Sequence, residues 1–132
     1  MSQENIEIVR RMNAAFNRGE EGWVVFYDPA VEFRTPPEWP EDDVYTGHDG
    51  IRHAAGLWAE SFSEYEWTID RLVDASDHVV ALHRHRGRIG DSDAWVERPL
   101  GAVYFLRAGK IVRVLSFFSW DEALKAAAEL EE

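Results

Sequence analysis

The sequence contains no cysteine, so disulfide bonds and thiolate chemistry are excluded. It also lacks a long apolar run: no segment approaches the roughly 20 apolar residues that a membrane-spanning helix needs. The polar start at residues 1–5 has neither the basic nor the apolar region of a secretory signal peptide. These absences predict a soluble, cytoplasmic protein that does not enter a membrane.

Basic residues are also scarce. The chain has 14 Lys and Arg against 25 Asp and Glu, which gives a formal net charge of -11. Such a charge repels nucleic-acid phosphates and anionic membrane surfaces, so neither is expected as a partner. The one basic cluster, at residues 83–88, is interpreted as a solvated strand face that offsets acidic neighbours.

The length of 132 residues suits one domain with one core, so a single domain is expected over residues 1–132. Apolar residues at helical spacing predict a first helix that ends at residues 17–19, where Gly19 provides the stop. A second brief helix fits residues 20–27, and residues 31–34 fit a short strand. Three prolines predict a loop at residues 35–44, interpreted as a flap.

A central helix follows an abrupt loop-to-helix transition at residues 45–52. Gly47 and Gly50 permit the positive φ or close backbone approach that a sharp helix entry needs, and Asp49 could cap the first turn. Downstream apolar residues recur at helical spacing and form one face. These residues are Ile51, Ala54, Ala55, Trp58, Ala59 and Phe62.

In the second half of the chain the apolar period changes from about 3.6 to 2, which is typical of strands. Strands are predicted at residues 65–70, 79–89, 94–106 and 111–119, followed by a helix that Asp121 could cap. Helices followed by hairpins predict an α+β fold with the helices on one face of a curved antiparallel sheet.

Five short segments, spread over nearly the whole chain, occur in an order that resembles the SnoaL-like branch of the NTF2-like superfamily. The segments are Phe16-Asn17-Arg18-Gly19, residues 26–32, residues 45–52, residues 106–112 and residues 121–124. The resemblance implies a cone-shaped fold: three to four helices packed on a strongly curved antiparallel sheet that encloses a ligand-sized cavity. It also implies varied functions, among them ketosteroid isomerase, polyketide cyclase, epoxide hydrolase and non-catalytic binding, and the fold does not decide between them.

The carboxylates that relatives use are replaced in this chain. The base of the ketosteroid isomerases lies in the strand where this sequence has Phe33, and the acid-base aspartate of the polyketide cyclases lies where it has Ser116 and Ser119. No Arg-x-Asp arrangement like that of the epoxide hydrolases is visible. The resemblance therefore favours binding, with catalysis left open.

Histidine chemistry is the catalytic alternative. His83 and His85 share one strand face, which we assign inward because three arginines in a dry cavity would each need a partner. Either could move protons near neutral pH, with Tyr104 and Arg98 of the next strand assisting. A zinc site at the histidine pair is disfavoured because no spacing selects a third ligand, so no metal or cofactor is expected.

Aromatic side chains favour a binding function. Six tryptophans are many for this length, and large flat side chains suit a planar, largely apolar or polycyclic ligand. The residues predicted to contact the ligand are Phe16, Trp23, Tyr27, Phe33, Trp39, Trp58, Phe62, Trp67, Ser116, Phe118 and Trp120.

The last two strands carry apolar side chains on both faces. Ile111, Leu115 and Phe117, with Val103 and Phe105 of the preceding strand, are placed on the outer face of the sheet. An outer face this apolar predicts a homodimer formed through it. A non-catalytic dimeric interaction module therefore stays open beside ligand binding and catalysis by an isomerase, cyclase or hydrolase.

Overall fold

The structure is a computed structural model, and it describes residues 2–19, 21–36, 44–60, 62–75, 77–90 and 94–130. Its helices are α1 (Ser2–Asn17), the 3₁₀ helix η1 (Glu21–Phe26), α2 (Gly47–Ala59) and α3 (Trp120–Leu130). Its strands are β1 (Tyr27–Arg34), β2 (Val44–Thr46), β3 (Glu64–Asp74), β4 (His78–Arg88), β5 (Trp95–Arg107) and β6 (Lys110–Phe117).

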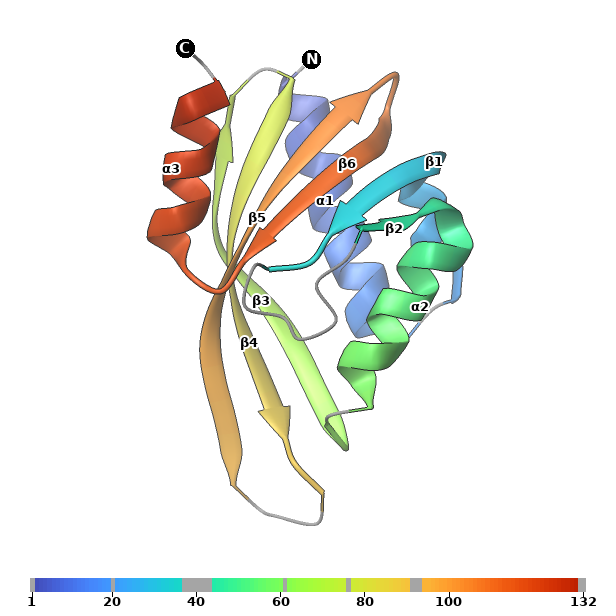
Figure 1. Cartoon of the computed structure of the whole chain (residues 1–132), viewed down its shortest axis with the longest axis vertical. Helices are drawn as coiled ribbons and strands as arrows, with labels where there is room; N and C mark the ends of the chain where they lie inside the picture. Colours follow the sequence, from blue (N-terminus) through green and yellow to red (C-terminus); the bar gives the residue numbers. More distant parts are fainter. Residues whose placement is uncertain are drawn as a thin grey trace.

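The six strands form one sheet in the order β2-β1-β6-β5-β4-β3 (Figure 1). All neighbours pair antiparallel except β1 and β6, which run parallel, so the sheet is mixed rather than wholly antiparallel. The predicted α+β class is confirmed. β6 lies beside β1 although β2, α2 and the strands β3 to β5 separate the two in the chain.

Helices lie on both faces of the sheet, which corrects the prediction that all of them share one face. α1 and α2 contact the inner face, whereas α3 packs on β4, β5 and β6 from the other side (Figure 1). Alternation along β4 separates the two layers: Val79 and Ala81 join the inner core, whereas Val80 and Leu82 join the cluster under α3. Part of the apolar outer face is thus covered by the chain itself.

Gly101 permits the close approach of α3 to the sheet. A Cβ at this position would lie 2.5 Å from the Cβ of Ala123, which is fully buried in α3. The helix begins at Trp120, and the Oγ of Ser119 accepts a hydrogen bond from the backbone N–H of Glu122 at 3.3 Å. Ser119 therefore caps α3, and Asp121, the predicted cap, lies inside its first turn.

A bulge in β6 moves Ile111 from the predicted outer face to the inner core. Phe105 pairs with Arg113, but Leu106 pairs with Ile111, so Val112 is an extra residue between the two pairs. The extra residue reverses the alternation, and Ile111 packs fully buried in the same cluster as Val114.

The entry to α2 has the geometry that the glycines predicted. Gly47 has a φ of 75°, and a Cβ on Gly50 would lie 3.1 Å from the backbone of Tyr45. Nε2 of His48 lies 2.8 Å from the carbonyl oxygen of Tyr27, which joins the start of α2 to β1. Asp49 lies inside the helix and pairs with Arg52.

The segment predicted as a second helix is shorter than expected. η1 ends at Phe26, and β1 already begins at Tyr27. Pro29 is accommodated in β1 because the pairing with β6 is irregular between Tyr27 and Glu32. Among the described residues no helix is long and apolar enough to cross a membrane.

Candidate functional site

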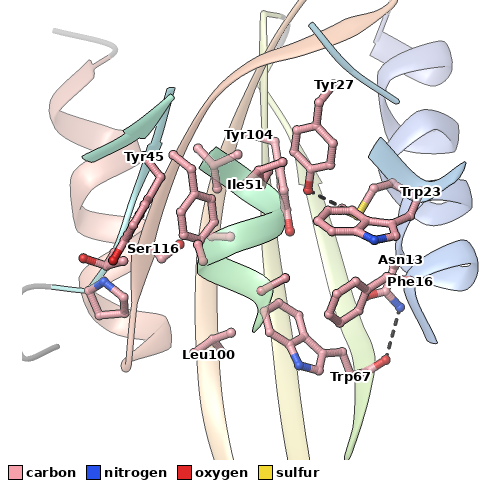
Figure 2. A pocket seen from close by; sticks show the side chains of 18 of the residues that line it. Asn13, Phe16, Trp23, Tyr27, Tyr45, Ile51, Trp67, Leu100, Tyr104 and Ser116 are labelled. Atoms are coloured by element: carbon pink, nitrogen blue, oxygen red, sulfur yellow. Dashed lines mark hydrogen bonds between the residues drawn. The ribbon is translucent and has the colours of Figure 1, made fainter. Parts of the chain in front are cut away.

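A cavity lies between the inner face of the sheet and the helices α1 and α2 (Figure 2). About 80 Å³ of it is open to the centre of a water-sized molecule. Its wall includes the predicted ligand contacts Phe16, Trp23, Tyr27, Phe33, Trp67 and Ser116, together with Tyr104. The remaining lining residues are Met12, Asn13, Thr35, Pro36, Tyr45, Ile51, Ala54, Ala55, Leu57, Leu100, Ala102 and Val114.

An aromatic corner forms one side of this cavity. The ring of Phe16 in α1 packs edge-on against Trp23 of η1, with centroids 5.1 Å apart, and against Trp67 of β3 at 5.4 Å. Trp23 in turn contacts Tyr27 at 5.7 Å. Edge-to-face contacts of this kind fix ring orientations, so the rings on this side of the cavity hold one another in place.

The amide groups near this corner are used in the fold. Nδ2 of Asn13 donates to the carbonyl oxygen of Trp67 at 3.1 Å, and Nδ2 of Asn17 donates to the same oxygen at 2.7 Å. The backbone N–H of Trp67 donates to Oδ1 of Asn17. These bonds attach α1 to β3.

Charged side chains are absent from the described lining. None of the lining residues is Asp, Glu, Lys, Arg or His. The polar side-chain groups of the lining residues are hydroxyls, the amide of Asn13 and the indole N–H groups of the two tryptophans. A charged ligand would lose its hydration there without gaining an ion pair, which is unfavourable.

His83 and His85 face inward, as the cost of burying the arginines of the same strand predicted, but neither is among the residues that line the cavity. His83 lies behind its wall, with Nε2 3.3 Å from the Tyr104 hydroxyl oxygen and its ring beside Trp67. His85 packs against the rings of Phe62 and Trp67. The two imidazoles therefore support the wall rather than form it.

Burial holds both histidines in the neutral form at pH 7. It lowers the pKa of His83 to about 4, although the Asp70 carboxylate opposes this shift. Burial, with the nearby charge of Arg98, lowers the pKa of His85 to about 4. Both values lie well below the range that suits proton transfer at neutral pH.

The other predicted site residues lie away from the cavity lining. The guanidinium of Arg98 lies 4.5 Å from the ring centroid of Phe118. Nε1 of Trp120 donates to the backbone oxygen of His83, and its ring packs in the cluster under α3. Phe62 contacts His85 instead of the cavity. Trp39 and the side chain of Trp58 lie outside the described residues.

Two of the three positions at which the resemblance led us to look for a carboxylate lie at the cavity. Phe33 and Ser116 do line the cavity, whereas Ser119 caps α3. Glu97 pairs with Arg84 and Arg86. Across the described parts of the chain, no three His, Asp or Glu side chains gather in a way that could hold a metal ion.

Several lining residues were missed as ligand contacts although a signal for them existed. Leu100 and Ala102 alternate with Tyr104 on the same face of β5, and Ile51, Ala54 and Ala55 share one face of α2. Small side chains are a weaker sequence signal for a binding site than aromatic side chains, yet they leave the space that a cavity needs. Thr35 and Tyr45 had no periodic signal.

The family model of the SnoaL-like domain matches residues 9–114. The chain belongs to the SnoaL-like family. No protein with a curated description matches this SnoaL-like chain.

Solved structures share the fold of this SnoaL-like protein over nearly its whole length. An NTF2-like protein of unknown function from Burkholderia pseudomallei is 17% identical, with a TM-score of 0.78 and coverage of 92% of this chain and 95% of that one. TerC, co-crystallized with polyporic acid, is 19% identical, with a TM-score of 0.77 and coverage of 96% and 97%. A protein with a ketosteroid isomerase-like fold from Catenulispora acidiphila, in complex with trimethylamine, is 17% identical, with a TM-score of 0.73 and coverage of 92% of each chain.

Proposed function

We propose that this SnoaL-like protein binds a small, uncharged, largely apolar molecule in the cavity between α1, α2 and the sheet. The observation that carries the proposal is an aromatic-lined cavity without a charged lining residue among those described. Burial of apolar ligand surface drives binding to such a cavity, and an ionised ligand would be rejected by the cost of its desolvation. The ligands of two proteins that share the fold, polyporic acid and trimethylamine, support a small-molecule function.

One-ring compounds are suitable probes, because about 80 Å³ of the cavity is open to the centre of a water-sized molecule, which is room for a small molecule rather than for a single water.

Ethylbenzene and benzoate provide a direct test, since both carry one ring and only benzoate is charged. Because Trp23 and Trp67 line the cavity, binding should change tryptophan fluorescence, and calorimetry gives the affinity. Ethylbenzene should bind and benzoate should not. If benzoate binds as tightly as ethylbenzene, or if neither binds, the proposal is wrong.

A matched pair of helix variants locates the bound molecule. Ala55→Leu in α2 adds volume to the cavity wall and should weaken ethylbenzene binding at least tenfold. Ala128→Leu in α3 makes the same change at an exposed position and should leave binding unchanged. Equal affinities in both variants would place the molecule elsewhere.

Catalysis by histidine is the alternative, and one contact favours it, between Nε2 of His83 and the Tyr104 hydroxyl. Burial opposes it, because a histidine with a pKa of about 4 and a phenol with a raised pKa exchange protons poorly at pH 7. We expect bound ligands to be recovered unchanged by mass spectrometry, with affinity retained in His85→Gln. Conversion of a ligand that stops in His83→Gln would favour the enzyme.

Homodimer formation through the outer sheet face also stays a proposal. Phe105, Leu115 and Phe117 are half-buried on that face, beside α3. α3 covers only part of it, so a second copy would have to pack beside this helix rather than on a bare sheet.

A further inference from the structure

Two tyrosine hydroxyls point into the cavity from different strands. Tyr27 begins β1 and Tyr104 lies in β5, and both side chains are almost completely buried. Figure 2 shows their hydroxyl groups directed toward the same part of the cavity, between Ile51 and Trp23. Such a convergence of polar groups in an otherwise apolar cavity is the usual way in which a binding site fixes the orientation of its ligand.

The hydroxyl of Tyr27 has only a weak acceptor in the fold. It lies 3.3 Å from Sδ of Met12, and a thioether sulfur accepts hydrogen bonds weakly. An oxygen atom of a ligand would be a stronger acceptor for the same proton. The donor capacity of Tyr27 is therefore poorly used by the protein itself.

The hydroxyl proton of Tyr104 is also available to a ligand in the cavity, because His83 donates to the Tyr104 oxygen and does not accept this proton. The neutral imidazole carries one proton, and Nδ1 is buried with no hydrogen-bond partner among the described residues. An unpaired buried N–H is less tolerated than an unpaired acceptor, so the proton belongs on Nε2. Nε2 then donates to the Tyr104 oxygen at 3.3 Å, and the Tyr104 proton must point away from His83.

Both phenols stay protonated and act as donors. Burial raises the pKa of Tyr104 and that of Tyr27, and for Tyr27 the charge of an ionised Tyr104 adds to the effect. The acceptor that they meet must be neutral, since no cationic side chain lines the described cavity to balance an anion.

We propose that the ligand is an uncharged carbonyl compound whose oxygen accepts hydrogen bonds from the hydroxyl groups of Tyr104 and Tyr27. The proposal rests on the proposed function and narrows its ligand class to small ketones, aldehydes, esters or amides with an apolar body. The aromatic corner holds the body, and the tyrosines select for the carbonyl.

Acetophenone and isopropylbenzene test this, since they have nearly the same shape and only acetophenone has a carbonyl oxygen. Each neutral hydrogen bond should contribute about fivefold in affinity, so the wild-type protein should prefer acetophenone roughly tenfold or more. Tyr104→Phe and Tyr27→Phe should each reduce the preference about fivefold and leave isopropylbenzene affinity unchanged. Tyr65→Phe, at a tyrosine outside the cavity lining, should change neither.

The carbonyl carbon gives a second readout that does not depend on affinity. On binding to the wild-type protein, the ¹³C resonance of carbonyl-labelled acetophenone should move downfield, and Tyr104→Phe should reverse part of that shift. If Tyr104→Phe does not fold, the wild-type shift and its loss in Tyr27→Phe carry the test.

Two results would overturn the carbonyl proposal. Equal affinity of the wild-type protein for the two compounds would overturn it while leaving ligand binding intact. A preference that persists in both phenylalanine variants would do the same. Failure of both compounds to bind would overturn the proposed function as well.

Discussion

Acidification should destabilise this protein through His83, and the size of the effect follows from its burial. His83 is fully buried, and burial lowers its pKa from 6.5 to about 4. Above pH 6.5 both the folded and the unfolded chain hold it neutral, so it adds no pH dependence. Between pH 6.5 and 4 only the unfolded chain binds the proton, and the free energy of unfolding falls as the pH falls. At about 1.4 kcal/mol per pH unit, the loss approaches about 3 kcal/mol near pH 4.

Urea unfolding of the wild-type protein and of His83→Gln, from pH 7 to pH 4, isolates this effect. Glutamine cannot titrate but can still offer an N–H toward Tyr104, so carboxylate contributions cancel in the difference between the two curves. The wild-type curve should be steeper between pH 6.5 and 4, by about 3 kcal/mol in total. His53→Gln removes an exposed imidazole from α2 and should follow the wild type. Parallel curves for the wild type and His83→Gln would refute the burial argument.

Two further predictions concern α3 and the outer face. Gly101→Ala should lower the free energy of unfolding by roughly 1–3 kcal/mol, because its Cβ would lie 2.5 Å from that of Ala123. Adding Ala123→Gly should recover part of that loss in urea unfolding. Gly56→Ala is the control, because an added Cβ there meets nothing within 4 Å, and it should not lower the free energy of unfolding. Strictly additive effects of Gly101→Ala and Ala123→Gly would contradict the packing of these two residues against each other. Sedimentation velocity at micromolar concentration should show twice the 15.2 kDa mass of one chain if the outer face forms a homodimer, and a monomer would reject that arrangement.

Local sequence signals predicted most of the elements. The apolar period of 3.6 and the stop at Gly19 located α1, and the glycines before Ile51 located the entry to α2. The change to a period of 2 located the hairpins β3–β4 and β5–β6. These signals depend on backbone conformation and side-chain spacing within a few residues, which a sequence displays directly.

Strand register, and the face of the sheet on which a residue or helix lies, were predicted less well. The bulge in β6 moved Ile111 to the inner core, and the sequence of that strand carries no signal that predicts an extra residue. Likewise, α3 has one apolar side wherever it packs, so its position on the outer face depends on the space that Gly101 leaves.

The candidate site shows the same division. Aromatic content pointed to Phe16, Trp23 and Trp67, which line the cavity, because large apolar side chains must be buried somewhere in a small domain. It could not distinguish those that line the cavity from Phe62, Phe118 and Trp120, which pack elsewhere. His83 and His85 face the interior, as the cost of burying the arginines predicted, but only the tertiary structure shows that His83 contacts Trp67 and Tyr104 of the cavity wall without lining the cavity itself.

The sequence by itself determined the α+β class and the resemblance to the SnoaL-like family, since both depend on which residues stand in which order. The tertiary structure alone decided that the cavity is lined without charge, that Tyr27 and Tyr104 converge in it, and that α3 covers part of the outer face. These properties join residues far apart in the chain, and their positions depend on strand register and helix docking, which the packing of the whole domain fixes.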